Sequence, residues 1–329
     1  MESTLLRTTF GFLSALCIAG AVPFTAQAQA QTWPTGPVRL IAPFPPGGPA
    51  DALTRYLGNK LSGALGQSVV VENIPGAAGG IAMQRLTRAE PDGYTIAFAH
   101  VGSLTINPHI YPTLGYDPLK DFTPIALVNE YENVLVVKPD APYKTLGELL
   151  AAAKAKPESI TYGSAGNGAS NHLSTELLSS MTGAKFNHIP YKGSAPALID
   201  VMGGTVDFMF DIIITSKPQI EANKLRALAT TGRSRSSELP DVPTVSETVP
   251  GYEVVGWGAI IGPKGMPQEV VQRVTSELEK IVNSEESAEL FKRQGFTQAY
   301  GTPAQLTELI KNDLTRWGEI VKSSGASAQ

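Results

Sequence analysis

The sequence is nearly devoid of cysteine: Cys17 is the only one in 329 residues. A disulfide framework and a zinc site built from cysteines are therefore excluded. Net charge is also small, because 26 Lys and Arg residues stand against 30 Asp and Glu residues and give −4. Near neutrality excludes the basic surface with which proteins bind nucleic acids. The 42% hydrophobic content excludes a largely disordered chain.

The motifs of common cofactor enzymes are missing as well. No G-x-G-x-x-G opens the first expected helix, and no phosphate-binding G-x-x-x-x-G-K-[ST] occurs. A G-x-S-x-G nucleophile turn is absent, and the four histidines show no H-E-x-x-H or similar metal-binding spacing. We therefore expect no cofactor, no metal ion and no catalytic residues.

The N-terminus has the features of a secretory signal peptide. Arg7 precedes residues 10–24, an uncharged apolar run of fifteen that is short for a membrane span. Small residues before Ala28 and Ala30 fit the cleavage rule at either position, so residues 1–30 are expected to be removed. Cleavage would also remove Cys17. The mature chain is thus expected outside the cytoplasm, and an uncleaved N-terminal anchor is the alternative.

The rest of the chain repeats one pattern of strand, glycine-containing loop and helix. A β-branched run at 38–42 is followed by a Pro-Gly break, and then by leucines four residues apart from Leu53 to Leu65, with Gly66 ending the helix. Similar units begin at 69, 95, 160, 186 and 206, and two amphipathic helices follow at 270–282 and 306–321. Alternating strands and helices predict an α/β fold with parallel-rich sheets flanked by helices.

Three glycine-rich segments, 43–51, 75–80 and 163–170, each follow an expected strand and open an expected helix. Ligands of open α/β sheets bind at the carboxyl ends of the strands. Glycine lets the backbone approach a ligand closely, and the free N–H groups of a first helical turn can hold an anion without a basic side chain. Each segment alone could be no more than a tight turn. Together they predict a carboxylate site.

Several further motifs give a resemblance to a known family. Residues 43–51 resemble the P-F-x-x-G-G-x-x-D signature of the Bug-type, TctC-like periplasmic substrate-binding proteins of tripartite tricarboxylate transporters. The other matching segments lie at 73–80, 91–94, 106–108, 163–168, 191–196, 206–211 and 242–244. The resemblance covers essentially the whole mature chain, in order.

This resemblance implies a two-domain, type II-like periplasmic-binding-protein fold, known as a Venus flytrap, with two crossovers between domains. Residues 31–128 and 250–329 are expected to form domain 1, and residues 129–249 domain 2. The implied function is capture of a small organic carboxylate between the domains by a monomer in the periplasm. The implied partners are the membrane permease subunits of such a transporter.

The resemblance also implies which residues contact the ligand. From domain 1 these are Phe44, Pro46, Gly47, Gly48, Ala50, Asp51, Ala77, Ala78, Gly79 and Ser103. From domain 2 these are Ser164, Ser170, Asn171, His172, Lys192 and Asp211.

Other readings of some of these residues stay open. Asp51 could be a helix N-cap instead, and His172 a structural histidine at a helix start. Lys192 could be an ordinary surface lysine. The glutamates within residues 129–133 match no motif and are expected to be solvated.

Two other function classes remain as alternatives. The chain could be a secreted serine hydrolase, if Ser103 or Ser164 assembles in space with His172 and Asp211. It could also be a receptor that reports its ligand to a membrane sensor protein, since the same closed form would serve transport and sensing.

Overall fold

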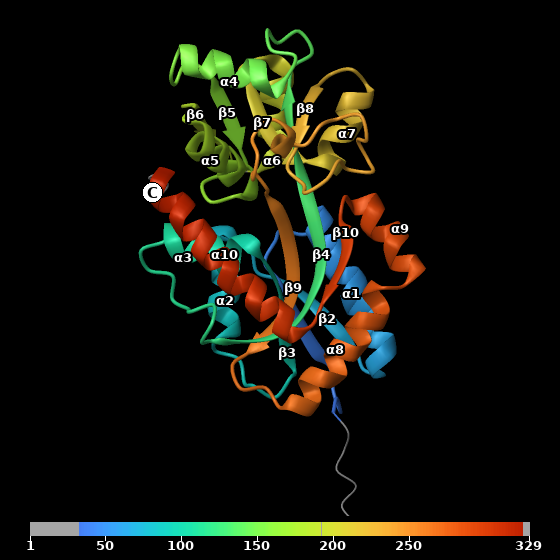
Figure 1. Cartoon of the computed structure of the whole chain (residues 1–329). Helices are drawn as coiled ribbons and strands as arrows, with labels where there is room; N and C mark the ends of the chain where they lie inside the picture. The colour runs from blue at the N-terminus through green and yellow to red at the C-terminus, as the bar shows by residue number, and fades with distance from the viewer. Residues whose placement is uncertain (1–32, 192, 325–329) are drawn as a thin grey trace, which may run out of the picture. The chain divides into compact units, whose positions relative to one another are not determined.

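The computed structural model describes residues 33–191 and 193–324. The expected signal peptide, residues 1–30, and Lys192 lie outside these ranges. The described residues form an α/β structure around a ten-stranded mixed sheet in the order β2-β1-β3-β9-β4-β7-β5-β6, with β8 and β10 also pairing with β4 (Figure 1). None of the helices in these ranges is long and apolar enough to cross a membrane.

The first three strands confirm the pattern expected from the sequence. Strands β1 (Val38–Ala42), β2 (Val69–Asn73) and β3 (Thr95–His100) pair in parallel. Helix α1 (Pro49–Leu65) joins β1 to β2, and α2 (Gly80–Leu86) lies between β2 and β3. Helix α1 ends where Gly66 adopts a left-handed φ of 68°, which glycine reaches without a steric cost.

A long strand that the sequence did not reveal runs through the middle of the sheet. Strand β4 (Phe122–Val137) pairs antiparallel with β9 (Val255–Pro263) and β10 (Thr297–Gly301) along its first part. Its second part, from Asn133 to Val137, pairs antiparallel with β7 and β8. The expectation that the glutamates of 129–133 are solvated is wrong: Glu130 and Glu132 are half-buried in β4, and burial raises the pKa of each.

A second parallel group lies at the other end of β4. It contains β5 (Thr161–Ser164), β6 (Asn187–Pro190) and β7 (Phe208–Ile212), with β8 (Arg226–Thr230) antiparallel to β4. Helices α5 (Ser170–Thr182), α6 (Ser194–Gly203) and α7 (Ile213–Glu221) follow β5, β6 and β7. The two parallel groups were expected, whereas the antiparallel strands that join them were not.

The remaining elements cover the sheet. They are η1 (Ala77–Gly79), η2 (Gly102–Ile106), α3 (Asn107–Ile110), α4 (Leu146–Ala155), η3 (Val245–Glu247), α8 (Gln268–Val282), α9 (Glu285–Gln294) and α10 (Pro303–Ser324).

The apolar faces predicted for the helices are buried. Leu53, Leu57 and Leu61 of α1 are fully buried in a cluster with β1, β3 and α8. A second cluster includes side chains of α2, α4, α5 and α10, and a third packs α6 against β4 and β7. Truncating a buried leucine to alanine typically costs about 2–5 kcal/mol, so these faces account for much of the stability.

Two buried tryptophans of the largest cluster, Trp257 and Trp317, differ in one hydrogen bond. The Trp257 Nε1–H donates to Oδ2 of the buried Asp313 at 2.7 Å, whereas the Trp317 Nε1–H has no partner among the described residues. Trp257→Phe should therefore lower the free energy of unfolding by about 1–3 kcal/mol more than Trp317→Phe, because it leaves a buried carboxyl group without its donor.

Urea unfolding of both variants measures this difference. Equal losses in the two variants would contradict a stabilising role for the Trp257–Asp313 hydrogen bond.

Candidate ligand-binding site

Two of the three glycine-rich loops, those after β1 and β2, lie beside the end of β3. The Phe44 ring after β1 lies 5.1 Å from the His100 ring at the end of β3. Gly79, after β2, packs so closely on its neighbours that a Cβ there would lie 3.0 Å from His100 Nε2, 3.2 Å from Ser103 and 3.3 Å from Pro43. The structure thus places three of the predicted site residues, Phe44, Gly79 and Ser103, around His100.

The first loop is held by Asp51, which is 3% exposed. Its Oδ2 accepts from the Gly47 N–H at 2.9 Å and from Arg55 Nε at 3.0 Å, and its Oδ1 accepts from Asn73 Nδ2 at 2.7 Å. Burial raises the pKa of Asp51, but the hydrogen bonds from Asn73, Gly47 and Arg55 outweigh burial and lower the pKa below its ordinary value. The carboxylate therefore fixes the loop while remaining charged.

The alternative role of Asp51 as a helix N-cap is wrong. The N-cap of α1 is Gly48. Pro49 begins the first turn of the helix, and Asp51 lies within that turn. Its carboxylate reaches back to the N–H of Gly47, which has a φ of 95°. Asp51 thus shapes the segment that precedes the helix.

The second loop is strained. Ala77 and Ala78 both have a φ of 47°, in the left-handed region that costs a residue with a Cβ about 1–2 kcal/mol. The buried Asn107 Nδ2 donates to the carbonyl oxygens of Ala77 at 3.1 Å and Ala78 at 3.2 Å, which holds them in place. Two adjacent left-handed alanines indicate that the backbone shape here serves a function.

The Ser103 hydroxyl is occupied by its own turn. Its Oγ donates to the carbonyl of His100 at 3.0 Å and lies 3.1 Å from the His100 N–H, which donates to it. Ser103 is fully buried, and these bonds connect the end of β3 to η2. The Ser103 carbonyl is occupied as well, since it accepts from the Tyr116 hydroxyl.

The third loop, between β5 and α5, is built in a similar way. Asn171 Oδ1 accepts from the N–H groups of Ala165 at 3.1 Å and His172 at 3.0 Å. The Gly168 N–H donates to His172 Nδ1 at 3.1 Å. Gly168 also packs against the segment after β3, since a Cβ on it would lie 3.0 Å from Ile110 Cδ1. The loop from the second parallel group is therefore a neighbour of η2 and α3.

The serine hydrolase triad considered from the sequence does not assemble. Ser164 Oγ lies 2.6 Å from His188 Nε2, not from His172, and Ser103 is bonded to its own turn. The two histidine rings stack at 4.2 Å, and Asp211 bonds to neither of them. Because each member has another partner, this alternative has no structural support.

Asp211, at the end of β7, is fully buried. Its Oδ2 accepts from the hydroxyl groups of Thr215 and Ser216, the latter at 2.8 Å, whereas its Oδ1 has no partner among the described residues. Burial raises the pKa of this carboxyl group despite the bonds from the two hydroxyl groups. Lys192, predicted on the preceding loop, lies outside the described residues.

Several residues of this region were not among the predicted site residues. Asn73 and Asn107 hold the two loops of the first group, and both belong to motifs of the sequence. His100 and His188 belong to no motif that marks them as site residues. His188 pairs with Ser164, which is 24 residues away, and His100 accepts from the backbone N–H of Gly102, which any residue type could provide.

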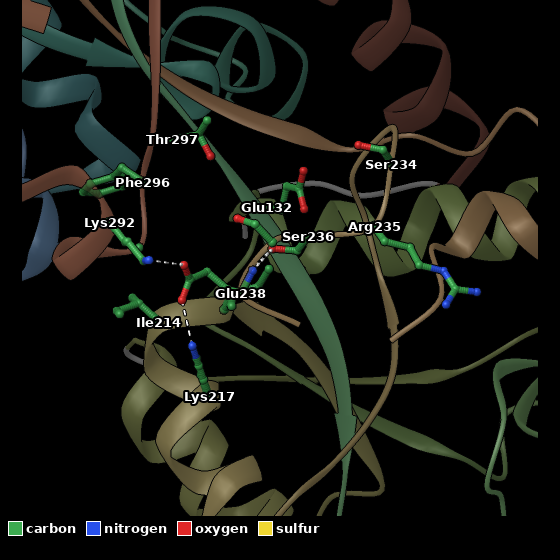
Figure 2. Close-up of a pocket in the computed structure, with 13 residues that line it drawn as sticks. Glu132, Ile214, Lys217, Ser234, Arg235, Ser236, Glu238, Lys292, Phe296 and Thr297 are labelled. Atoms are coloured by element: carbon green, nitrogen blue, oxygen red, sulfur yellow. Dashed lines mark hydrogen bonds and ion pairs between the residues drawn. The ribbon is translucent and has the colours of Figure 1, made fainter. Parts of the chain in front are cut away.

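A separate pocket of about 420 Å³ opens beside α7 and α9, and Figure 2 shows its lining. Glu238 accepts from Lys217 at 2.8 Å and pairs with Lys292 at 3.7 Å, and Arg235 and Glu132 also line the pocket. Burial raises the pKa of Glu132, whose Oε2 has no partner among the described residues. None of the described site residues lines this pocket.

No group of three or more potential metal ligands occurs within the described residues.

The hydrogen bonds of Asp51 predict a large effect of its removal. Asp51→Ala should lower the free energy of unfolding by about 2–4 kcal/mol, because it removes the acceptor of the Gly47 N–H, the partner of Arg55 and one of the two acceptors of Asn73 Nδ2, the other being the Phe44 carbonyl. Asp92 is the matched control: it also accepts a backbone N–H, from Tyr94 at 2.9 Å, but in an exposed turn. Asp92→Ala should cost no more than about 1 kcal/mol, and an equally small loss for Asp51→Ala in urea unfolding would refute the role given to Asp51.

The stacked histidines predict sensitivity to acid. Burial lowers the pKa of His172 to about 3 and that of His188 to about 4, below the ordinary 6.5. The unfolded chain therefore binds protons first as the pH falls below 6.5, so acidification favours unfolding. His172 is 5% exposed. Its protonation in the unfolded chain should lower the free energy of unfolding by about 2 kcal/mol between pH 7 and pH 4.5.

Unfolding measured at both pH values tests this expectation. Over this interval the free energy of unfolding of His172→Gln should fall by about 2 kcal/mol less than that of the unmodified chain. His109→Gln, a substitution at an exposed position, is the control, and its free energy of unfolding should fall as much as that of the unmodified chain. An unchanged pH dependence in His172→Gln would show that this side chain is not buried in its neutral form.

Comparison with known proteins finds the same fold in solved structures. Among solved structures, Rpa4515 of R. palustris with adipate has a TM-score of 0.81 and 35% identity, and the match covers 90% of this chain and 99% of that one. The periplasmic binding protein BugD gives a TM-score of 0.78 and 35% identity over 90% and 100% of the two chains. MatC from Rhodopseudomonas palustris with bound malate has a TM-score of 0.76 and 29% identity, and the match covers 88% of this chain and 100% of that one.

The family model described as the tripartite tricarboxylate transporter family receptor, TctC, matches residues 53–326. That segment includes the second and third loops and most of α1. The chain therefore belongs to the TctC, or Bug, family of periplasmic solute-binding receptors.

Proposed function

We propose that this chain binds one small organic carboxylate in the periplasm and delivers it to the permease subunits of a tripartite tricarboxylate-type transporter. The observation that carries the proposal is the pair of left-handed alanines, Ala77 and Ala78, held by Asn107. Such a loop costs stability, and a site that recognises an anion through backbone N–H groups gives that cost a function.

The ligand's carboxylate would lie against the loops that follow β1 and β2. The donors would be N–H groups of the first turn of α1, where Pro49 has none, and of the 76–80 loop, where those of Gly79 and Gly80 already donate to the carbonyls of Gly76 and Ala77. The positive end of the α1 dipole favours a negative charge. Phe44 would cover one side of the site, since its ring already packs on Phe98 and His100. Binding through N–H groups needs no arginine in the site.

The proposed contacts from domain 1 are Phe44, Pro46, Gly47, Gly48, Ala50, Asp51, Ala77, Ala78, Gly79 and Ser103. Those from domain 2 are Ser164, Ser170, Asn171, His172, Lys192 and Asp211. In this set Asp51 and Asn171 position backbone groups, because their side-chain oxygens already accept bonds from the loops.

We further propose that the two parallel groups of strands belong to two domains, 31–128 with 250–329, and 129–249, connected in part by β4. The chain would act as a monomer, and the ligand would lie between the domains. The relatives with adipate and malate support a carboxylate as the ligand class, and the periplasmic relative supports export directed by residues 1–30. A binding protein of this kind performs no reaction, since closure around the ligand supplies affinity.

A thermal-shift panel tests the ligand class. Malate, succinate, adipate, glutamate and benzoate are compared with glucose and putrescine. At least one acid should raise the melting temperature, because a ligand at 100 times its Kd adds about 2.7 kcal/mol. A shift from glucose or putrescine with none from the acids would overturn the proposed class.

Two glycine variants locate the binding site within this assay. Gly79→Ala places a Cβ 3.0 Å from His100 Nε2 at a φ of 85°, and should abolish the shift. Gly66→Ala introduces the same kind of backbone strain, at a φ of 68°, but its Cβ meets nothing within 4 Å. This control should lower the melting temperature of the free protein while keeping the ligand shift. Retention of the shift in Gly79→Ala would place the ligand elsewhere.

A further inference from the structure

His100 carries a hydrogen-bond donor that no described residue accepts. The side chain stands at the end of β3, between the Phe44 ring and the backbone of Gly79. Its Nε2 atom is buried and has no partner among the described residues. An unpaired buried polar group costs about 1–3 kcal/mol, so its retention needs an explanation.

The proton of the neutral ring lies on that atom. His100 Nδ1 accepts a hydrogen bond from the Gly102 N–H at 3.1 Å, so Nδ1 cannot carry a proton at the same time. The neutral ring must then be protonated at Nε2, which makes Nε2–H a donor. Burial lowers the pKa of His100 to about 4, so the ring stays neutral near pH 7.

Nearby groups do not supply the missing acceptor. The Asp51 carboxylate is already bonded to Gly47, Arg55 and Asn73, and the Ser103 hydroxyl is bonded to the backbone of His100. The carbonyl oxygens of Ala77 and Ala78 accept from Asn107. A Cβ placed on Gly79 would meet His100 Nε2 and, next to it, only carbon atoms of Ser103 and Pro43, which cannot accept a hydrogen bond.

We propose that the Nε2–H of His100 donates a hydrogen bond to an oxygen of the bound carboxylate, which makes His100 a ligand-binding residue. This inference rests on the proposed function and adds a neutral side-chain donor to the backbone donors of the first two loops. It also specifies the ligand class further. The end of the ligand that enters between Phe44 and Gly79 carries an acceptor, so an acid is preferred there over an amine.

Two substitutions distinguish the acceptor role of Nδ1 from the donor role of Nε2. In His100→Asn the side-chain oxygen can still accept from the Gly102 N–H, but the donor at the Nε2 position is deleted. In His100→Gln the longer side chain places an amide N–H near the Nε2 position. His109→Asn, at an exposed position, is the matched control.

The probe is the acid among malate, succinate, adipate, glutamate and benzoate that gives the largest thermal shift with the unmodified chain, and calorimetry gives its Kd. His100→Asn should weaken binding about tenfold or more, which corresponds to about 1.4 kcal/mol, while His100→Gln recovers most of the affinity. His109→Asn should bind like the unmodified chain. Stability without ligand is the second readout: both variants lose the ring that packs against Phe44, but His100→Asn should lose no more stability than His100→Gln, because the donor that it deletes had no partner.

Four outcomes decide the matter. A loss of affinity in His100→Asn that exceeds its loss of stability, with recovery of affinity in His100→Gln, supports the proposal. Binding by His100→Asn within twofold of the unmodified chain overturns it and leaves the proposed function standing. Equal losses of stability and affinity also overturn it, because they show a structural role. No shift from any acid with the unmodified chain overturns both the proposed function and this inference.

Discussion

The candidate site depends on side chains that hold backbone groups in conformations which the backbone alone would not keep. Asp51 binds the Gly47 N–H and Asn73, and Asn107 binds the carbonyl oxygens of Ala77 and Ala78. The bonds made by Asn73 and Asn107 link segments that are distant in sequence, so the loops take their shape only once the first three strands have paired. A site arranged in advance loses less entropy on binding, which raises affinity without further contacts.

The same principle explains why the region contains few free charges. Asp51 is ionised but surrounded by donors, and the histidines near the site are neutral because they are buried. An anion would therefore meet N–H dipoles rather than a full positive charge. The separate pocket beside α7 and α9 differs, because charged side chains line it: Lys217, Arg235 and Lys292 together with Glu132 and Glu238.

Local patterns predicted the elements that are built from local interactions. The leucines of α1, the terminating Gly66 and the strand at Val38–Ala42 were predicted where the structure has them. Strand β4 could not be predicted in this way, because its Asn129 and Asn133 are buried only through pairing with β9 and β7, over a hundred and nearly eighty residues away. The position of Asp51 inside the first turn, and the unpartnered nitrogen of His100, likewise depend on contacts between segments. The glycine loops themselves were evident from the sequence, together with their resemblance to the Bug family.

A crystal structure with the tightest-binding acid of the panel tests the central claim most directly. The account predicts that the carboxylate oxygens lie within about 3 Å of backbone nitrogen atoms in residues 44–51 and 76–80. Ligand density at a different place, with only water against these two loops, would contradict it.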